Sequence, residues 1–545
     1  MLRMKPVGKG ERGARRAELY YAKTDAGVGY YRDRDGLHSE WLGQGAITLD
    51  LAGRTPDYEH FKRLLRGLDP WSGDQLTARL RDDRIPCWDL TVSMPKGPTL
   101  AIERGDGRVL AAFRESYREA FALLERYATT RVRLDGRQED RVTGNLVAYV
   151  VEHPDTRPVE DETLPEDHPW RVMPLPDRHA HLVVANETWD AVEGRWKAVK
   201  FRPIMDLRKY FDRCFDAIFA AKLADLGYEI ETEWRTDARG RTSYYSWDIK
   251  GMPAAVLERL SKRSQEIDTL EQAIIAERKE LDPYAPDHLS PVERDRLGAT
   301  SRRQKRDDLT LDECRRYWET LISPEEGRAI AETIRRAMLG RPEARPEQAA
   351  ARAADFAMRH HFEAEAAVPL EQLVATALEH GMGSARPGDI ERELTRLGVL
   401  LVEQDGRTLA TTHHRATHPR GRSSGRVCRQ RAGHGRPGRP GRRPDADAGQ
   451  RRAAHRRPVA RRRRAFDQRE SREFSPGPGR GGQVEAPQEI RRRGKAGGPA
   501  RHLSRHHLDL GQGAATGRLR RPDRRPLPAG YGVASGGPRR PGRRR

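Results

Sequence analysis

The sequence predicts an α+β fold for residues 1–252, because strand-like runs alternate there with segments of helical periodicity. The strand-like runs are "DLTVSM", "NLVAYVV" and "HLVVAN", and the helical segments cover about residues 110–127 and 210–226. Gly227 is a natural end for the second helix. We expect the two helices to bury one face each, formed by Leu110, Phe113, Tyr117, Ala120, Phe121 and Leu124 and by Phe211, Cys214, Phe215, Ile218, Phe219 and Leu223.

Two further ordered segments are expected after the first domain. Residues 271–345 are highly charged with sparse apolar positions, which predicts a charged helical linker. Residues 346–413 predict a second unit, with a helix that starts at Pro369, a helix that ends at Gly398, and a hairpin that turns at Asp405–Gly406. Two helices followed by a hairpin indicate a small winged-helix-like module. A structural connector of the same shape is the alternative.

The C-terminal segment, residues 414–545, differs in composition from the rest. It holds 36 Arg and one Lys against nine Asp and Glu, a net charge of +28, whereas the whole chain carries +21. Its Arg, Gly and Pro content predicts a disordered tail. Translation of GC-rich DNA in a shifted reading frame is the alternative origin. Residues 1–413 therefore carry about −7, so any nucleic-acid contact there must come from a local patch.

Cysteine usage and hydropathy predict a soluble cytoplasmic protein. The four cysteines lie far apart and form no CxxC pair, which argues against a zinc ribbon or a disulfide framework and fits a reduced compartment. No run of 18 apolar residues occurs, and the N-terminus has no signal-peptide pattern. We therefore expect no membrane association.

Two histidines, His179 and His181, stand two residues apart in "PLPDRHAHLVVAN". On a strand they share one face, roughly 6–7 Å apart, so that both imidazoles can reach one ion. A third ligand is expected from His153, which ends the strand "NLVAYVV", or from His168, which lies in a Pro- and acid-rich stretch. Three neutral imidazoles suit a divalent transition metal with open positions for substrate oxygens. Polar strand residues without a metal are the alternative.

Two adjacent tyrosine pairs lie near the N-terminus, Tyr20–Tyr21 and Tyr30–Tyr31, in "ELYYAKTDAGVGYYRD". Aromatic packing is the ordinary use of such residues. A tyrosine can also act as a nucleophile toward phosphorus, provided that a base or a cation assists its phenol, whose ordinary pKa is about 10.

Asp89 is the candidate for such assistance. In "CWDLTVSMPK" it shares a strand face with Thr91 and Ser93. From that polar face it could orient a histidine or accept a proton. An exposed strand aspartate without such a role is the alternative.

Taken together, these stretches resemble the TrwC/TraI (MobF) class of conjugative relaxases within the HUH endonuclease superfamily, over about residues 1–270. The resemblance follows the order of the family's motifs: the tyrosine pairs at 20–21 and 30–31, "EWLGQGA" (40–46), "FKRLLRG" (61–67), "DLTVSMPK" (89–96), "VTGNLVAYVVEHPDTRP" (142–158), "HAHLVVANETWD" (179–190), "GRWKAV" (194–199) and "LADLGYEIE" (223–231). It implies an antiparallel sheet palm with helical fingers over single-stranded DNA.

The resemblance also implies an activity, a cofactor and partners. A tyrosine attacks one phosphodiester at a plasmid nick site and leaves a 5′-phosphotyrosyl adduct, with Tyr20 and Tyr30 as the nucleophiles of the two pairs. His153, His179 and His181 match the metal-holding triad, with Mg²⁺ or Mn²⁺ expected and Zn²⁺ possible. Asp89 matches the aspartate that orients a histidine or assists the nucleophile. The implied partners are single-stranded or hairpin DNA at a transfer origin, with accessory relaxosome and coupling proteins.

Three features depart from the family pattern. The stretch between His153 and His179 is long, which keeps His168 open as an alternative ligand, and "SMPKGPTL" lacks the family's serine-rich ending. Family members usually continue into a helicase, but no GxxxxGK[ST] phosphate loop follows residues 253–413. We therefore expect no nucleotide binding and no helicase activity. A non-catalytic remnant that binds single-stranded or hairpin DNA is the alternative function.

Overall fold

The computed structural model of the chain describes residues 2–25, 38–237, 240–306, 308–340, 346–404 and 406–412, within the unit Met1–Gln430. The tyrosine pair at 30–31, the turn residue Asp405 and the tail at 414–545 lie outside the described residues. The predictions made for them, including the disordered tail and the shifted reading frame, therefore stay predictions.

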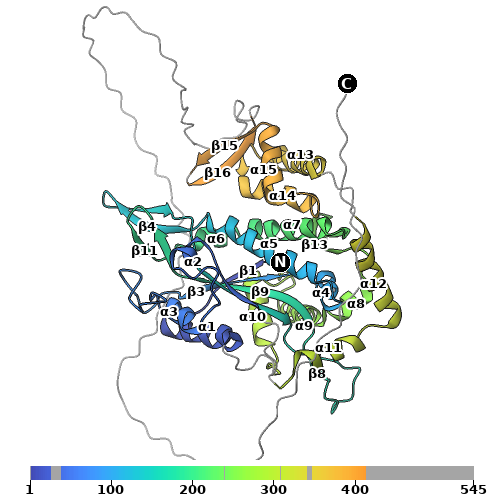
Figure 1. Cartoon of the computed structure of the whole chain (residues 1–545). Coiled ribbons are helices and arrows are strands. Elements are labelled where there is room, and N and C mark those ends of the chain that lie inside the picture. Colours follow the sequence, from blue (N-terminus) through green and yellow to red (C-terminus); the bar gives the residue numbers. More distant parts are fainter. Residues whose placement is uncertain are drawn as a thin grey trace, which may run out of the picture. The chain divides into compact units, whose positions relative to one another are not determined.

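An antiparallel sheet of five strands, in the order β1-β3-β9-β6-β2, forms the centre of the fold (Figure 1). Its strands are β1 (Leu2–Pro6), β2 (Ser39–Leu42), β3 (Cys87–Ser93), β6 (Ala148–Asp155) and β9 (Pro176–Ala185). The three strand-like runs of the sequence overlap β3, β6 and β9, the three inner strands, although the run that predicts β6 begins three residues earlier, at Asn145. The predicted α+β class with an antiparallel sheet is confirmed.

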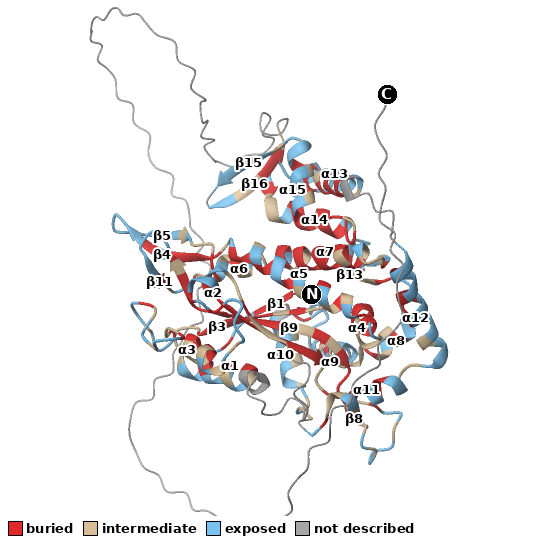
Figure 2. Ribbon diagram, in the orientation of Figure 1, coloured by how far each residue is buried: buried red, intermediate tan, exposed pale blue. Residues whose placement is uncertain are grey.

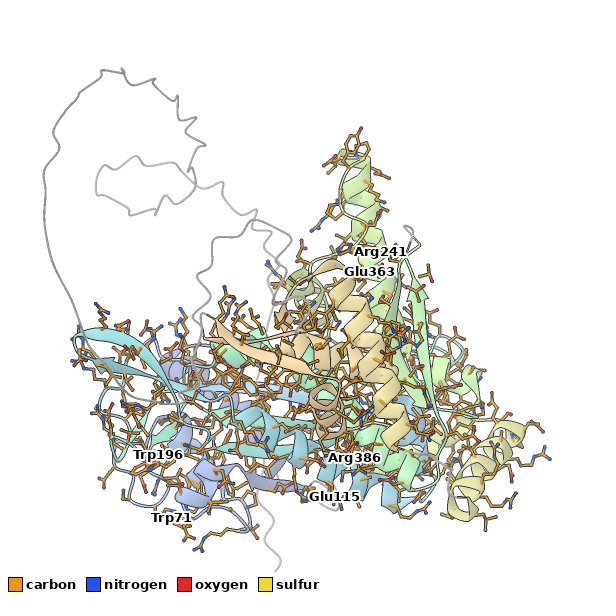
Figure 3. The ribbon with its side chains drawn as sticks, turned by 90° about the horizontal axis from the view of Figure 1, so that it is seen from above. Trp71, Glu115, Trp196, Arg241, Glu363 and Arg386 are labelled. Atoms are coloured by element: carbon orange, nitrogen blue, oxygen red, sulfur yellow. The ribbon has the colours of Figure 1, made fainter. Side chains whose placement is uncertain are left out.

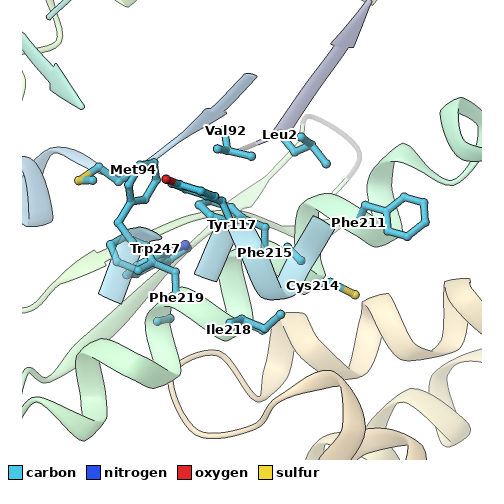
Figure 4. Packing of buried hydrophobic residues seen from close by; sticks show 14 of the residues in the cluster. Leu2, Val92, Met94, Tyr117, Phe211, Cys214, Phe215, Ile218, Phe219 and Trp247 are labelled. Atoms are coloured by element: carbon cyan, nitrogen blue, oxygen red, sulfur yellow. The ribbon is translucent and has the colours of Figure 1, made fainter. Parts of the chain in front are cut away.

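One face of the sheet is covered by α5 (Gly107–Glu125) and α7 (Arg208–Asp225), the two helices expected from periodicity. Figure 4 shows Phe215 of α7 beside Tyr117 of α5 in the main core, to which Phe211 and Phe219 of α7 also belong. Their side chains are buried, as predicted, and Leu110 at the start of the predicted face is half-buried. The even-numbered residues of β3 and β9, such as Leu90 and Leu182, point into the same core.

The opposite face of the sheet packs against α1 (Gly10–Asp25) and α3 (Tyr58–Leu65), which lie together below the sheet in Figure 1. A second core forms there, in which Phe61 and Leu64 of α3 meet Tyr149 of β6 and Val183 of β9. Along β9 this face changes from histidines at 179 and 181 to apolar residues at 183 and 185. The apolar end of β9 therefore packs against the helices, while its polar end carries the two histidines.

The charged segment forms a series of helices: α8 (Ala254–Arg259), α9 (Lys262–Leu281), α10 (Pro291–Thr300), α11 (Leu311–Thr320) and α12 (Pro324–Leu339). Figure 2 shows much exposed surface on them, as their charge indicates. Several of their side chains, among them Tyr317, Trp318 and Ile330, are nevertheless buried in the main core. The segment thus packs on the sheet domain along α11 and α12.

The last described segment contains α13 (Pro346–Ala364), β14 (Val368–Pro369), α14 (Leu370–His380), α15 (Pro387–Arg396) and the hairpin of β15 (Val399–Gln404) and β16 (Arg407–Thr412). The order of two helices and a hairpin is the order expected from the sequence, with Leu373, Val374 and Ala377 buried. Arg386, labelled in Figure 3, forms an ion pair with Asp225 at the end of α7. The winged-helix interpretation and the domain boundaries at 270 and 345 stay predictions.

Shorter elements connect these layers. They are α2 (Gln44–Thr48), α4 (Lys96–Glu103), α6 (Arg202–Asp206), β4 (Thr129–Leu134), β5 (Arg137–Val142), β7 (Val159–Glu160), β8 (Val172–Met173), β10 (Thr188–Asp190), β11 (Arg195–Lys197), β12 (Ile230–Thr236) and β13 (Thr242–Ile249). Among the helices of the described residues, none combines the length and the apolar character that crossing a membrane requires.

Candidate functional site

The structure gathers three histidines at the polar end of the sheet. His153 on β6 is the register partner of His179 on β9, and His181 lies two residues further on the same face. Their ring centroids form a triangle with sides of 5.2, 5.1 and 5.2 Å. One nitrogen of each ring lies within 4.8 Å of the other two. A single ion could therefore contact all three imidazoles.

His168, the alternative third histidine, lies elsewhere. It belongs to the long connection between β6 and β9, which contains the small β7–β8 pair. Its Nδ1 accepts a hydrogen bond of 3.1 Å from the backbone N–H of Trp170. The long connection thus forms a loop beside the sheet and leaves the arrangement of His153 with His179 and His181 intact.

Two of the three imidazoles are oriented through their Nδ1 atoms. His181 Nδ1 lies 2.8 Å from Asp89 Oδ1, and His179 Nδ1 lies 2.8 Å from the backbone carbonyl oxygen of Asp177. An ionised carboxylate and a carbonyl can only accept, so each Nδ1 carries the proton and donates. The Nε2 lone pair of each ring is then available to an ion, which is the usual arrangement behind a metal-binding histidine.

The local electrostatics keep the imidazoles of His153 and His179 neutral. Burial, followed by the neighbouring histidines, holds the pKa of His153 well below its ordinary value, and Lys305 and Arg157 lower it further. Burial and His181 lower the pKa of His179 to about 4. Neutral imidazole is the form that binds a metal ion, so the donor set fits a divalent transition metal at neutral pH.

Asp89 is buried yet ionised. Burial alone would raise the pKa of this carboxyl, but His181 and the ammonium of Lys5, 3.2 Å from Oδ2, outweigh burial and hold the pKa below its ordinary value. Lys5 reaches Asp89 because the two residues are register partners between β1 and β3. Asp89 is therefore a poor proton acceptor and a good orienting group for His181.

Helix α1 brings the first tyrosine pair against His181. The ring centroids of Tyr20 and Tyr21 lie 5.8 and 5.5 Å from that of His181. Tyr21 is 2% exposed, and burial together with the charge of Asp89 raises its pKa well above the ordinary value. Tyr20 is half-buried, so only the first tyrosine of this pair combines proximity with access. The second pair lies outside the described residues.

Two basic side chains lie beside the Tyr20 ring, and neither was expected there from the sequence. Lys305 Nζ lies 5.2 Å and Arg157 Cζ 6.0 Å from the centre of the Tyr20 ring. Arg157 stands four residues after His153 in "VVEHPDTRP", so its position just beyond the same strand was a usable signal. Lys305 lies in the segment expected to be a linker, and no local pattern connects it with Tyr20.

The sequence of this chain is similar to those of known proteins. The model of one protein family, described as TrwC relaxase, matches residues 14–323. Two curated proteins from Escherichia coli, both called multifunctional conjugation protein TraI and one of them from strain K12, are 31% and 30% identical over 257 residues. Each match covers 44% of this chain and 13% of the relative, so the chain spans about an eighth of the length of these relatives.

Solved structures of similar proteins are also found. One is the conjugative relaxase TrwC in complex with oriT DNA, in a metal-bound structure, at 25% identity and a TM-score of 0.45, covering 59% of this chain and 97% of that chain. Another is TrwC with a 27-mer DNA that comprises the recognition hairpin and the cleavage site, at 25% identity and a TM-score of 0.44, covering 60% and 99%.

Proposed function

Since the chain belongs to the TrwC relaxase family, we propose that it is a conjugative relaxase that nicks one DNA strand at a specific site and transfers that strand. The observation that carries this proposal is the position of Tyr20 on α1: its ring centroid lies 5.8 Å from that of His181, a member of the three-histidine cluster. A nucleophile and a candidate metal site on one sheet face are the two parts that metal-assisted phosphoryl transfer needs.

His153, His179 and His181 would hold the metal ion. When bound, a divalent ion supplies a positive charge that polarises the scissile phosphate and stabilises the charge that develops on it. An all-nitrogen donor set suits Zn²⁺ and other late transition ions better than Mg²⁺ or Mn²⁺, which prefer oxygen ligands. Of the ions expected from the sequence, Zn²⁺ therefore fits these three donors best, and Mn²⁺ is the second ion to test.

Tyr20 would be the nucleophile. Its phenolic oxygen forms a bond to phosphorus, and the bond between phosphorus and the 3′-oxygen breaks. The phenolic proton leaves to solvent, and a solvent proton completes the 3′-hydroxyl, so that a 5′-phosphotyrosyl protein and a free 3′ end result. Lys305 and Arg157 place positive charge beside the ring of this tyrosine. Tyr30 would serve the later strand exchange.

Asp89 would act through His181. Its Oδ1 accepts the Nδ1 proton of that imidazole and so directs Nε2 toward the ion. Of the two roles open from the sequence, orienting a histidine is supported by this contact, whereas transfer of a proton from Tyr20 is not supported by any contact between the two residues among those described.

The DNA partner follows from membership of the family. We infer a hairpin and a single strand at a transfer origin as the substrate, and the TrwC structures described above hold oriT DNA, one of them with a recognition hairpin. Accessory relaxosome proteins and a coupling protein are further proposed partners. Helicase activity is not proposed, because no phosphate-loop motif is present in the sequence.

Covalent capture tests the proposal. The full chain is incubated with Zn²⁺ and, in parallel, with Mn²⁺, together with end-labelled single strands that cover the DNA element on which its gene lies. The products are separated on a denaturing gel. We expect one strand to form a covalent protein adduct and a free 3′ end. A Tyr20→Phe, Tyr30→Phe double variant should form none, and His179→Ala should lose both the adduct and the bound metal.

The controls separate the alternatives. Tyr284→Phe, which changes an exposed tyrosine, should leave the adduct unchanged. An adduct that persists in the double variant would rule out the tyrosine assignment. Tight binding of one hairpin strand by the wild type without any adduct would instead establish the non-catalytic remnant.

A further inference from the structure

A bulge interrupts strand β9 directly before the histidines. The register of β6 against β9 shifts between His153 and Asp155. As a result, two residues of β9, Asp177 and Arg178, lie opposite the single residue Pro154 of β6. Proline has no backbone N–H, so Pro154 cannot donate a ladder hydrogen bond to the bulge. The backbone that includes the carbonyl of Asp177 therefore needs support from another element.

Helix α4 supplies support, since it packs against β9 (Figure 1). Thr99 Oγ1 accepts a hydrogen bond of 3.4 Å from the backbone N–H of Arg178, and Glu103 Oε1 accepts one of 3.0 Å from Nε of the same arginine. At the start of the helix, the backbone N–H of Gly97 donates to Asp248 Oδ1 at 3.0 Å, and a Cβ at this glycine would lie 2.2 Å from that oxygen. Close contacts on two sides therefore fix the position of α4.

Lys96, the first residue of α4, connects the helix to the bulge. Its Nζ donates to the backbone oxygen of Pro176 at 2.9 Å and to Oδ1 of Asp177 at 2.7 Å. The backbone oxygen of Asp177 in turn accepts the Nδ1 proton of His179 at 2.8 Å. Lys96 thus holds the peptide group before Asp177 and the side chain of Asp177, while the next carbonyl along the chain orients the imidazole.

We propose that Lys96 is a positioning residue of the metal site, which fixes the bulge of β9 so that Asp177 directs Nε2 of His179 toward the ion. The inference rests on the proposed function and adds a residue that sets the geometry of its metal site. His181 is oriented by the side chain of Asp89, whereas His179 depends on a backbone carbonyl. The direction of that carbonyl follows from the path of the chain, and the contacts of Lys96 constrain this path.

Metal affinity tests the inference. The full chain is dialysed against a chelator, then against metal-free buffer, and titrated with Zn²⁺ by isothermal titration calorimetry. Lys96→Met keeps an unbranched apolar side chain and removes the ammonium, so we expect the Zn²⁺ affinity to fall about 10–100-fold. Lys96→Arg, which keeps a cationic donor, should recover most of the affinity. Lys222→Met is the matched control, because Lys222 is also largely buried and lies 3.2 Å from Glu115, and it should bind like the wild type.

A second variant separates an orienting role from a general loss of stability. Asp177→Ala removes the carboxylate that Lys96 contacts and keeps the backbone carbonyl, so the affinity should fall here too. Because both residues act through one contact, the double variant should lose no more affinity than Lys96→Met alone. The visible absorption spectrum of bound Co²⁺ depends on the geometry of the ligands. It should change in both single variants and stay unchanged in Lys222→Met.

The outcomes distinguish this inference from the proposed function. Wild-type Zn²⁺ affinity in Lys96→Met, or losses that simply add in the double variant, would overturn the inference alone. If Lys96→Met does not fold, an unchanged affinity and an unchanged Co²⁺ spectrum in Asp177→Ala would overturn it. Failure of the wild type to bind either Zn²⁺ or Co²⁺ would overturn the metal site of the proposed function itself.

Discussion

Asp89 Oδ1 and His181 Nδ1 are 2.8 Å apart, in a contact that joins two neighbouring strands on one face of the sheet. The other oxygen of the same carboxylate, Oδ2, lies 3.2 Å from Lys5 Nζ. Asp89 is thus held on two sides, and its contact with Nδ1 orients the His181 ring. Through this pair, strand β3 supports a histidine of the proposed metal site on β9.

Replacing Asp89 by asparagine should weaken metal binding. The amide oxygen can still accept from His181 Nδ1, but without the negative charge that strengthens the histidine as a ligand. Removal of such a supporting group commonly costs 10–100-fold in metal affinity, and we expect a decrease of about that size for Mn²⁺ or Zn²⁺ by isothermal titration calorimetry. Asp83→Asn, at an exposed aspartate, is the matched control. Equal affinities in both variants would show that Asp89 does not support His181.

The two adjacent tyrosines should respond differently to removal of their hydroxyls. Tyr21→Phe removes a buried hydroxyl beside Asp89, so we expect the free energy of unfolding to fall by about 1–2 kcal/mol while adduct formation persists. Tyr20→Phe should leave stability nearly unchanged and remove the adduct that Tyr20 forms. Denaturant titration and a denaturing gel give the two readouts. A stable Tyr21→Phe variant without adduct would reverse the assignment within the pair.

Much of the sheet domain could be predicted because its signals are local. Helical periodicity in the sequence predicted α5 and α7, and apolar runs predicted the inner strands β3, β6 and β9. The alternation of a strand put His179 and His181 on one face, and the end of a neighbouring run supplied His153. These features depend on residues a few positions apart, which a single sequence displays.

The remaining parts of the site depend on tertiary contacts. Lys5 meets Asp89 only because β1 pairs with β3, and Lys305 meets Tyr20 only because a helical hairpin returns the chain to the sheet. The choice between His153 and His168 likewise required the path of the connection between β6 and β9. Neither charge pattern nor periodicity carries such information.

The packing of α7 on the sheet predicts a large stability effect at Phe215. This residue is fully buried, with ring centroids 6.0 Å from Phe113 and 6.1 Å from Phe219. Phe215→Ala should lower the free energy of unfolding by about 3–5 kcal/mol, as measured by denaturant titration. Metal affinity should be unchanged, because Phe215 lies on the opposite face of the sheet from the histidines. A decrease below about 1 kcal/mol would show that this core is loosely packed.

Glu187 predicts a pH dependence of stability that is independent of the active site. The side chain is fully buried and pairs with Arg84 through Oε1, while Oε2 has no hydrogen-bond partner among the described residues. Burial raises the pKa of this carboxyl from 4.5 to about 7, although Arg84 acts against the increase. The folded state therefore retains a proton that the unfolded chain loses near pH 4.5. The contribution of Glu187 to the free energy of unfolding is therefore fully present below pH 4.5. It is lost as the pH rises through about 7.

Glu187→Gln should remove that dependence, because glutamine keeps an acceptor for Arg84 and cannot ionise. The stability of the wild type relative to the variant should fall by an amount on the order of 3 kcal/mol as the pH rises from 4.5 to above 7. Denaturant titrations of both proteins at a series of pH values measure the difference. Glu59→Gln, at an exposed carboxylate, should run parallel to the wild type. Parallel curves for wild type and Glu187→Gln would instead mean that Glu187 ionises in the folded protein as it does in the unfolded chain.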